Sequence, residues 1–259
     1  MNWFEAIILA LIEGLTEFLP VSSTGHMILG SAAMGVENDD FTKLFMIVIQ
    51  LGAILAVFVL YFKRFFQSVQ FYLKLIVAFI PAAVLGVLLS DYIDELLESP
   101  MAVGISLLIG GIILLFVDKW FNKPTVLEEE KVTYLTALKI GFFQCIAMIP
   151  GVSRSAATII GGITQGLSKR QAAEFSFFLG IPVLMGAGLL DMYKMRHELH
   201  SNDMAILAVG IIVAFVSALI VIRALIRYVS KHDFTAFAYY RIVFGLFILA
   251  TWWTGWVHW

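Results

Sequence analysis

The chain alternates between long apolar runs and short polar stretches. A helix that crosses a bilayer needs roughly 20 consecutive apolar residues. Six segments reach about that length, with edges that can shift by a few residues: 42–62, 72–90, 101–118, 172–190, 204–226 and 237–257. The pattern therefore predicts an all-α polytopic membrane protein with six transmembrane helices.

Two further regions, 3–34 and 137–166, are apolar but interrupted. The first is broken at Pro20 and the second at Pro150-Gly151, so each piece is too short to span a bilayer. Irregular backbone at membrane depth is tolerated only where protein or water surrounds it. We therefore expect two re-entrant hairpins, each made of two half-helices.

The order of these segments indicates an internal repeat. Residues 1–118 form one hairpin followed by three spans, and residues 137–259 have the same order. Residues 119–136 form a polar linker between the two. We expect both repeats to belong to one structural domain.

Basic residues orient the predicted spans, because Lys and Arg concentrate in cytoplasmic loops. Threading six spans through a bilayer places one set of basic residues on a single side: Lys63, Arg64, Lys74, Lys119, Lys123, Lys131, Lys139, Lys169, Arg170, Arg223, Arg227 and Lys231. With that side cytoplasmic, both termini lie outside and the two repeats have inverted topology. The hairpins then enter from opposite sides, and their tips can meet near the midplane.

Composition agrees with a membrane protein and excludes other classes. Hydrophobic residues make up 61% of the 259 residues and charged residues 14%, and the mean hydropathy is +0.93. Such a chain is too apolar for a soluble globular domain. Its net charge of −2 provides no basic surface for nucleic acid.

Charged residues inside the hairpins mark the candidate site, since ionisable groups at bilayer depth are costly and usually functional. Glu13 and Glu17 are four residues apart and share one helix face. Two carboxylates in a low dielectric repel each other unless one is protonated, a divalent metal binds, or Arg154 lies nearby. An oxygen-rich pair suits Mg²⁺ or Ca²⁺, with a phosphate completing the coordination shell.

The residues after each break predict an anion site. Ser22 or Ser23, and Ser153 or Ser155, are natural N-caps for the second half-helices. Two helix N-termini directed at the midplane would present free N–H groups to an anion. Glycines at the turns allow close approach of the backbone, and Arg154 adds a fork that matches phosphate. Two glycines and two threonines complete the predicted anion site: Gly25, Gly151, Thr24 and Thr158.

A histidine follows the first serine pair. His26 is three residues after Ser23, so on a helix the two side chains are neighbours and could form a nucleophile and base. Polar residues also interrupt three spans at Gln50, Glu174 and Arg241. We expect Arg241 to lock helices together; the other two could either line a cavity or lock helices.

The two motifs resemble one known family. Glu13-x-x-x-Glu17, then Pro20-x-Ser-Ser-Thr-Gly-His26, and Pro150-Gly-x-Ser-Arg-Ser-x-x-Thr158 resemble the bacterial undecaprenyl-diphosphate phosphatase family, the bacitracin-resistance type. The resemblance extends over nearly the whole chain. It implies dephosphorylation of a C55 polyprenyl diphosphate to the monophosphate, which recycles the carrier for peptidoglycan synthesis. It also implies a divalent metal and a site that opens to the outer face of the cytoplasmic membrane.

Carried over by position, the resemblance assigns the site residues. Glu13 and Glu17 are the acids, and the serine-histidine cluster consists of Ser22, Ser23, Thr24 and His26. The phosphate-binding loop consists of Gly151, Ser153, Arg154, Ser155 and Thr158. We expect Ser23 to attack the terminal phosphate, with Glu17 or His26 accepting its proton. In another version of this hypothesis His26 protonates the leaving oxygen.

A transporter or flippase of lipid phosphates is the competing hypothesis. Inverted repeats with broken helices that meet at the midplane are also typical of secondary transporters. Span count and orientation do not separate the two functions. The serine, histidine and paired acids favour an enzyme, because anion binding alone requires no nucleophile. In either case the partners are a polyprenyl diphosphate lipid and the bilayer, and a homo-oligomer is compatible with the sequence.

Overall fold

The computed structural model describes residues 1–66, 69–97, 99–121, 123–125, 132–195, 197 and 203–257. Residues 122 and 126–131 of the predicted linker lie outside the described residues. This range includes Lys131, one of the basic residues used to orient the spans.

Six helices in the described residues are long and apolar enough to cross a membrane. They are α3 (Asp40–Leu60), α4 (Val69–Leu88), α6 (Pro100–Trp120), α9 (Lys169–Lys194), α10 (Met204–Val229) and α11 (Thr235–Thr254). Each coincides with one predicted span, and the ends differ by a few residues. The prediction of a multi-pass, all-helical membrane protein is therefore confirmed.

The two interrupted regions form pairs of shorter helices. The first pair is α1 (Trp3–Thr16) with α2 (Ser23–Met34), and the second is α7 (Tyr134–Ile146) with α8 (Arg154–Thr164). The longest of them, α1, has 14 residues and is about 21 Å long, so it is shorter than the roughly 30 Å hydrocarbon layer. Both chain breaks lie where proline and glycine predicted them. The start of α7 at Tyr134 leaves a connection after α6 that is shorter than the predicted linker 119–136.

Two short elements were not predicted. A 3₁₀ helix, η1 (Phe62–Phe66), follows α3, and α5 (Ser90–Leu97) follows α4. Their lengths of 5 and 8 residues are too small for a periodic pattern to be distinguished from a polar turn.

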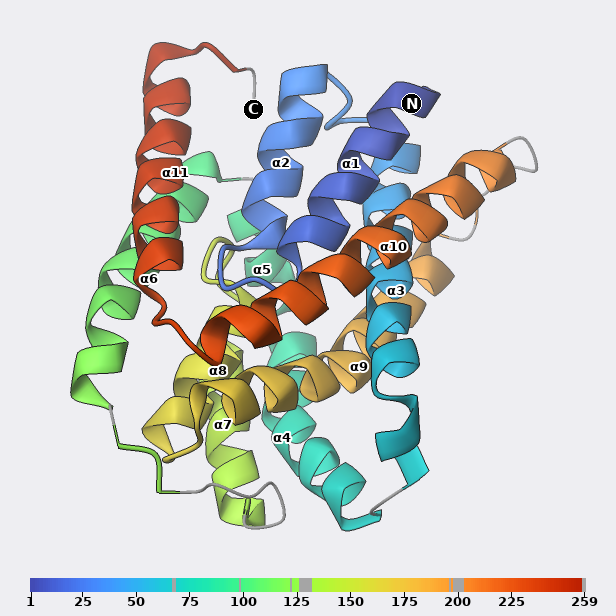
Figure 1. Ribbon diagram of the computed structural model, residues 1–259. Coiled ribbons are helices and arrows are strands. Elements are labelled where there is room, and N and C mark those ends of the chain that lie inside the picture. The colour runs from blue at the N-terminus through green and yellow to red at the C-terminus, as the bar shows by residue number, and fades with distance from the viewer. Residues whose placement is uncertain are drawn as a thin grey trace.

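Helices from the two halves of the chain pack against each other. α6 packs along α11, α3 along α10 and α9, α1 along α10, and α4 along α7. In Figure 1, the α1–α2 pair lies in the upper part of the molecule and the α7–α8 pair in the lower part, with their connecting turns near the middle. The largest buried hydrophobic cluster contains Phe18 and Val57 from the first half and Phe177 and Ile222 from the second. The two halves therefore share one core around the turns.

Candidate active site

Each break is followed by a serine with an unusual backbone. Ser22 has φ of 71°, and its side chain accepts a hydrogen bond from the N–H of Gly25 at 3.3 Å. Ser153 has φ of 74°, and its side chain accepts from the N–H of Ala156 at 3.2 Å. A positive φ is uncommon for residues other than glycine, and such strain often accompanies functional turns. Of the candidate caps, Ser22 and Ser153 therefore have this role, while Ser23 and Ser155 make other contacts.

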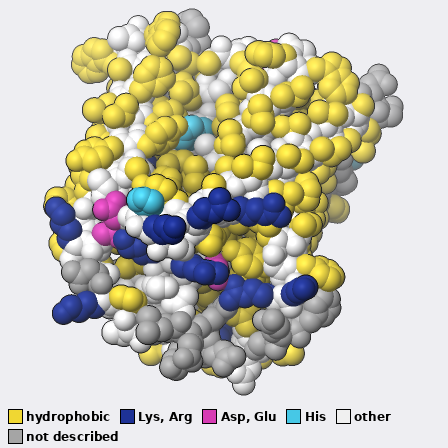
Figure 2. All heavy atoms as spheres, in the orientation of Figure 1, with side chains coloured by type: hydrophobic (Ala, Val, Ile, Leu, Met, Phe, Trp, Pro, Cys, Tyr) yellow, Lys and Arg dark blue, Asp and Glu magenta, His cyan; other side chains and the backbone are white. Residues whose placement is uncertain are grey.

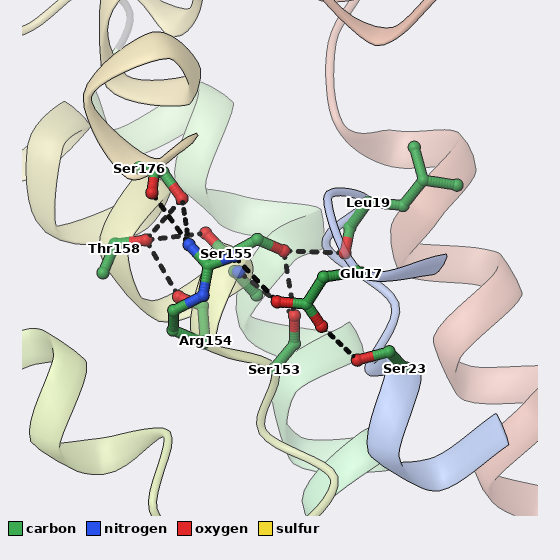
Figure 3. A network of polar contacts seen from close by, with 9 residues as sticks. Glu17, Leu19, Ser23, Ser153, Arg154, Ser155, Thr158 and Ser176 are labelled. Atoms are coloured by element: carbon green, nitrogen blue, oxygen red, sulfur yellow. Dashed lines mark hydrogen bonds and ion pairs between the residues drawn. The ribbon is translucent and has the colours of Figure 1, made fainter. Parts of the chain in front are cut away.

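An ion pair joins the two turns (Figure 3). Nη2 of Arg154, at the start of α8, lies 2.8 Å from Oε1 of Glu17, which follows α1. The other carboxylate oxygen of Glu17 accepts a hydrogen bond of 2.5 Å from Oγ of Ser23. Both Glu17 and Arg154 are nearly buried, so the pair is screened little by water. The structure thus places the predicted acid, serine and arginine in one contact network.

Arg154 also makes hydrogen bonds to α9. Its Nη1 donates to the carbonyl oxygen of Ser176 at 2.8 Å, and Oγ1 of Thr158 donates to Oγ of Ser176 at 2.7 Å. Ser176 was not predicted as a site residue. The only signal for it in the sequence is one hydroxyl among phenylalanines, which is weak because serine is common in packed membrane helices.

Ser155 fixes the position of the first turn. It is fully buried, its Oγ donates to the carbonyl oxygen of Leu19 at 2.7 Å, and the Oγ atoms of Ser153 and Ser155 lie 3.1 Å apart. These contacts, drawn in Figure 3, connect the second turn to the first through side chain and backbone. We therefore assign Ser155 a structural contact as well as its predicted place in the phosphate loop.

Glu13 is the least satisfied charged group of the site. It is 1% exposed, and neither of its carboxylate oxygens has a hydrogen-bond partner among the described residues. It interacts electrostatically with Glu17 and Arg154. The amide of Gln144, on α7, is also buried and without a partner in the described part of the chain. A buried carboxylate without partners is costly, so its oxygens are suited to a ligand.

The described contacts include no hydrogen bond between His26 and Ser23. Nδ1 of His26 lies 2.7 Å from the carbonyl oxygen of Ser22, and Nε2 lies 2.6 Å from the hydroxyl of Tyr240 on α11. The imidazole also stacks on Phe244, with ring centroids 4.0 Å apart. Both ring nitrogens are thus engaged away from Ser23. Spacing alone could not predict this, because the local carbonyl one turn back competes for the ring.

Arg241 holds both turns from α11 and is fully buried. Its Nη1 donates to the carbonyl oxygens of Pro20 at 3.1 Å and Val152 at 2.9 Å, and its Nη2 donates to Gly151 at 3.0 Å. Further bonds reach the carbonyl oxygens of Ser106 at 3.3 Å and Leu107 at 3.5 Å. The expectation that Arg241 locks segments together is confirmed.

The remaining predicted residues have different surroundings. A Cβ atom at Gly151, where φ is 89°, would lie 2.5 Å from the carbonyl oxygen of Val103, so this glycine allows the second turn to approach α6. Gly25 is buried, whereas Thr24 is exposed and has no hydrogen bond to the network in the described contacts. Gln50 is half-buried in α3. Glu174 lies in a separate ion pair with Arg64.

The described residues contain no group of three or more His, Cys, Asp or Glu side chains that could hold a metal. A cation at Glu13 and Glu17 would complete its shell with other oxygen ligands, such as a phosphate, water or the unpartnered amide oxygen of Gln144. Mg²⁺ in phosphoryl-transfer sites is usually bound in this way, by one or two carboxylates, phosphate oxygens and water. The unpartnered oxygens of Glu13 fit such a cation.

Known proteins resemble the chain over nearly its whole length. A family model described as bacitracin resistance protein BacA matches residues 6–247. An undecaprenyl-diphosphatase of Flavobacterium johnsoniae is 60% identical over 253 residues, which cover 96% of both chains. An undecaprenyl-diphosphatase of Bdellovibrio bacteriovorus is 49% identical over 257 residues, 98% of both chains. Undecaprenyl-diphosphatase 2 of Rhodospirillum rubrum is 48% identical over 265 residues, covering 98% of this chain and 97% of the relative.

Proposed function

The chain belongs to the bacitracin resistance protein BacA family, and we infer from this that it is an undecaprenyl-diphosphatase of the membrane. It hydrolyses undecaprenyl diphosphate to undecaprenyl phosphate and inorganic phosphate, and so recycles the carrier for peptidoglycan synthesis. The structural observation that supports this activity is the hydrogen bond of 2.5 Å from Ser23 to Glu17. An anion transporter has no need of a serine directed at a carboxylate, so the transporter hypothesis is not favoured.

We propose that the two pairs of short helices are re-entrant hairpins in an inverted repeat. Support comes from their length and from equivalent packing in the two halves: α1 lies along α10 and α7 lies along α4. The basic residues then orient the protein in the cytoplasmic membrane with its termini outside. We further propose that the active site opens toward the outer face.

We propose that the diphosphate binds between the two turns, with the prenyl tail among the helices. Arg154 presents a charged fork, and the N-terminus of α8 adds backbone N–H groups and a positive dipole. In phosphoryl transfer, positioning and stabilisation of charge provide most of the rate enhancement. Arg154 is oriented by Ser176 and Glu17, and its Nε has no hydrogen-bond partner among the described residues, so Nε is available to a phosphate oxygen.

The proposed nucleophile is Ser23. Its Oγ attacks the terminal phosphorus, the bond to the bridging oxygen breaks, and undecaprenyl phosphate leaves. Glu17 accepts the serine proton, since its Oε2 already receives that hydrogen bond. A water molecule then hydrolyses the phosphoserine, which releases inorganic phosphate and restores the serine hydroxyl. In the alternative role, a protonated His26 donates its Nε2 proton to the leaving oxygen, and Nε2 must then exchange its contact with the Tyr240 hydroxyl for that oxygen.

Glu13 and Glu17 are the proposed ligands of a divalent cation, Mg²⁺ or Ca²⁺. When bound, the cation would neutralise negative charge on the phosphates. Glu17 also keeps its contacts with Arg154 and Ser23, so Glu13 is the residue with both oxygens available. Glu13→Gln should therefore weaken binding of the divalent cation, so that more cation is required for half-maximal activity. The Glu17–Arg154 pair should stay in place.

The experiment that tests this function is phosphate release from a long polyprenyl diphosphate by purified protein in detergent, with Mg²⁺ or with EDTA. Arg154→Ala should lower release by about 10²–10³-fold, the range for loss of one preorganised charge-stabilising group. Lys139→Ala, at an exposed lysine of α7, is the matched control and should retain full activity. Absence of release by folded wild-type protein that binds the lipid would contradict the proposal.

A second experiment tests the covalent step. Rapid quenching of the enzyme with substrate labelled in its terminal phosphate should trap label on Ser23, and Ser23→Ala should remove both the label and turnover. Ser23→Ala should leave thermal unfolding close to wild type, because Ser22 rather than Ser23 caps α2. Near-normal turnover by Ser23→Ala would contradict the covalent route and favour direct attack by water.

A further inference from the structure

A charged cavity lies away from the two turns of the proposed active site. It is found where the end of α3, the start of α9 and the end of α10 meet. Its volume is about 460 Å³, and its wall includes Arg170, Arg223, Arg227 and Lys231. We call it the α10 pocket. None of these four residues makes a described contact with Glu17, Ser23 or Arg154, so the α10 pocket is separate from the proposed active site.

Three of the four cations of the α10 pocket have no acidic partner among the described residues: Arg223, Arg227 and Lys231. Arg223 and Arg227 are four residues apart and share one side of α10, and Lys231 follows just after the helix ends at Val229. Like charges at this spacing repel and destabilise a helix slightly. No ion pair with an acidic side chain is found for these three in the described part of the chain.

The one carboxylate in the wall is already engaged. Oε2 of Glu174 lies 2.7 Å from Nη1 of Arg64, and Oε1 lies 3.0 Å from Nε of Arg170. It therefore offers no further oxygen to the α10 residues. The α10 pocket has an excess of cations that can attract an anion.

The wall is apolar as well as basic. Leu60, Ile222 and Ile226 line it together with the cations, and Ile222 is almost completely buried. In Figure 2, Lys and Arg side chains gather on the lower half of the visible face around a patch of hydrophobic side chains. The preference of Lys and Arg for the cytoplasmic side would explain scattered basic residues. It does not explain a cavity that combines them with an apolar wall.

We propose that the α10 pocket binds the phosphate of an anionic phospholipid headgroup. Arg223 and Arg227 contact the phosphate, and the first carbons of the acyl chains lie against Leu60 and Ile226. Basic pockets between transmembrane helices are suited to such headgroups. Free inorganic phosphate has the same charge chemistry but makes no use of the apolar wall. The proposal does not depend on the phosphatase activity.

The test measures lipid binding to the full-length protein in detergent by native mass spectrometry. Phosphatidylglycerol and phosphatidylcholine with identical acyl chains are titrated separately. We expect phosphatidylglycerol to bind the wild type, and the double variant Arg223→Gln/Arg227→Gln to bind it roughly 10- to 30-fold more weakly, from the contribution of each arginine near a lipid phosphate. The control Lys123→Gln/Lys139→Gln removes the same charge at two exposed lysines and should bind like the wild type.

Three results would overturn the proposal. Equal binding of the two lipids by the wild type would exclude an anionic headgroup site, and equal losses in both double variants would reduce the effect to net charge. Competition by millimolar inorganic phosphate that fully displaces phosphatidylglycerol would assign the α10 pocket to free anions instead of lipid. Thermal unfolding of both variants without lipid verifies that they are folded.

Discussion

Gly180 lies directly against the guanidinium of Arg154: a Cβ atom built on Gly180 would come within 2.8 Å of Nη1. Any side chain at this position of α9 would push the arginine out of its contact with Glu17. We expect Gly180→Ala to lower kcat/KM by about 10- to 100-fold, less than complete removal of the arginine. Steady-state phosphate release at saturating and limiting substrate measures the effect.

Gly186→Ala is the matched control on the same helix. A Cβ atom there would meet Phe79 at 3.5 Å, an ordinary van der Waals distance. Its activity and unfolding temperature should equal those of the wild type. Full activity of Gly180→Ala would show that Arg154 tolerates displacement and is not positioned by the backbone of α9.

Replacement of Arg241 should unfold the region that contains both turns. Arg241→Met leaves carbonyl oxygens of both turns buried without donors, each at a cost of about 1–3 kcal/mol. We expect a loss of at least about 3 kcal/mol, which lowers the apparent Tm in detergent by roughly 10 °C. Lys139→Met, at an exposed position, should leave Tm unchanged. An unaltered Tm for Arg241→Met would mean that the turns are held by other contacts.

The backbone of Ser22 gives a prediction with opposite outcomes for two substitutions. At φ of 71°, glycine is tolerated without strain, and as a cap it is only a few tenths of a kcal/mol weaker than serine. Ser22→Gly should therefore keep its stability within about 1 kcal/mol. A branched side chain is poorly tolerated at positive φ, so Ser22→Val should be destabilised by about 2 kcal/mol or more. Thermal unfolding of the two variants distinguishes an effect of the backbone conformation from an effect of the hydroxyl. If only the hydroxyl mattered, both variants would lose the same stability.

Tyr240 orients His26 from α11, so Tyr240→Phe should lower kcat by about tenfold or less with little change in KM. The estimate is the usual effect of losing one hydrogen bond to a neutral partner. The stacking of His26 on Phe244 keeps the ring in place. The neighbouring Tyr239 is exposed, and Tyr239→Phe serves as the control. Identical rates for both variants would show that the hydroxyl of Tyr240 does not support His26.

Much of the fold could be predicted because apolar length determines whether a helix spans a bilayer. The breaks at Pro20 and Gly151 could also be located, since these residues interrupt helices for local steric reasons. An ion pair of Arg154 with Glu13 or Glu17 was one of the alternatives that the high cost of isolated charge left open, and the structure shows the pair with Glu17. These properties depend on residue type and on near neighbours in the chain.

Contacts that depend on tertiary packing could not be predicted. Ser176 and Tyr240 are single polar residues in apolar helices, and nothing in their local sequence indicates which partner they meet. The ring of His26 contacts Ser22 and Tyr240 instead of Ser23, because spacing on a helix gives proximity without fixing the direction of a ring. The small helix α5 was missed because its eight residues contain too few periods of the helical pattern.

The position of Arg241 on α11, which follows both motifs in the chain, also determines when the site can form during synthesis. Helices enter the membrane in order as the chain is made, N-terminal parts first. Until the last span is inserted, the carbonyls of Pro20 and Gly151 have no guanidinium to bind, although every acid, serine and arginine of the two motifs has already been translated. A nascent chain that stalls before α11 therefore contains the chemical groups of the enzyme but not their arrangement. The arrangement therefore requires that α11 has been made and inserted.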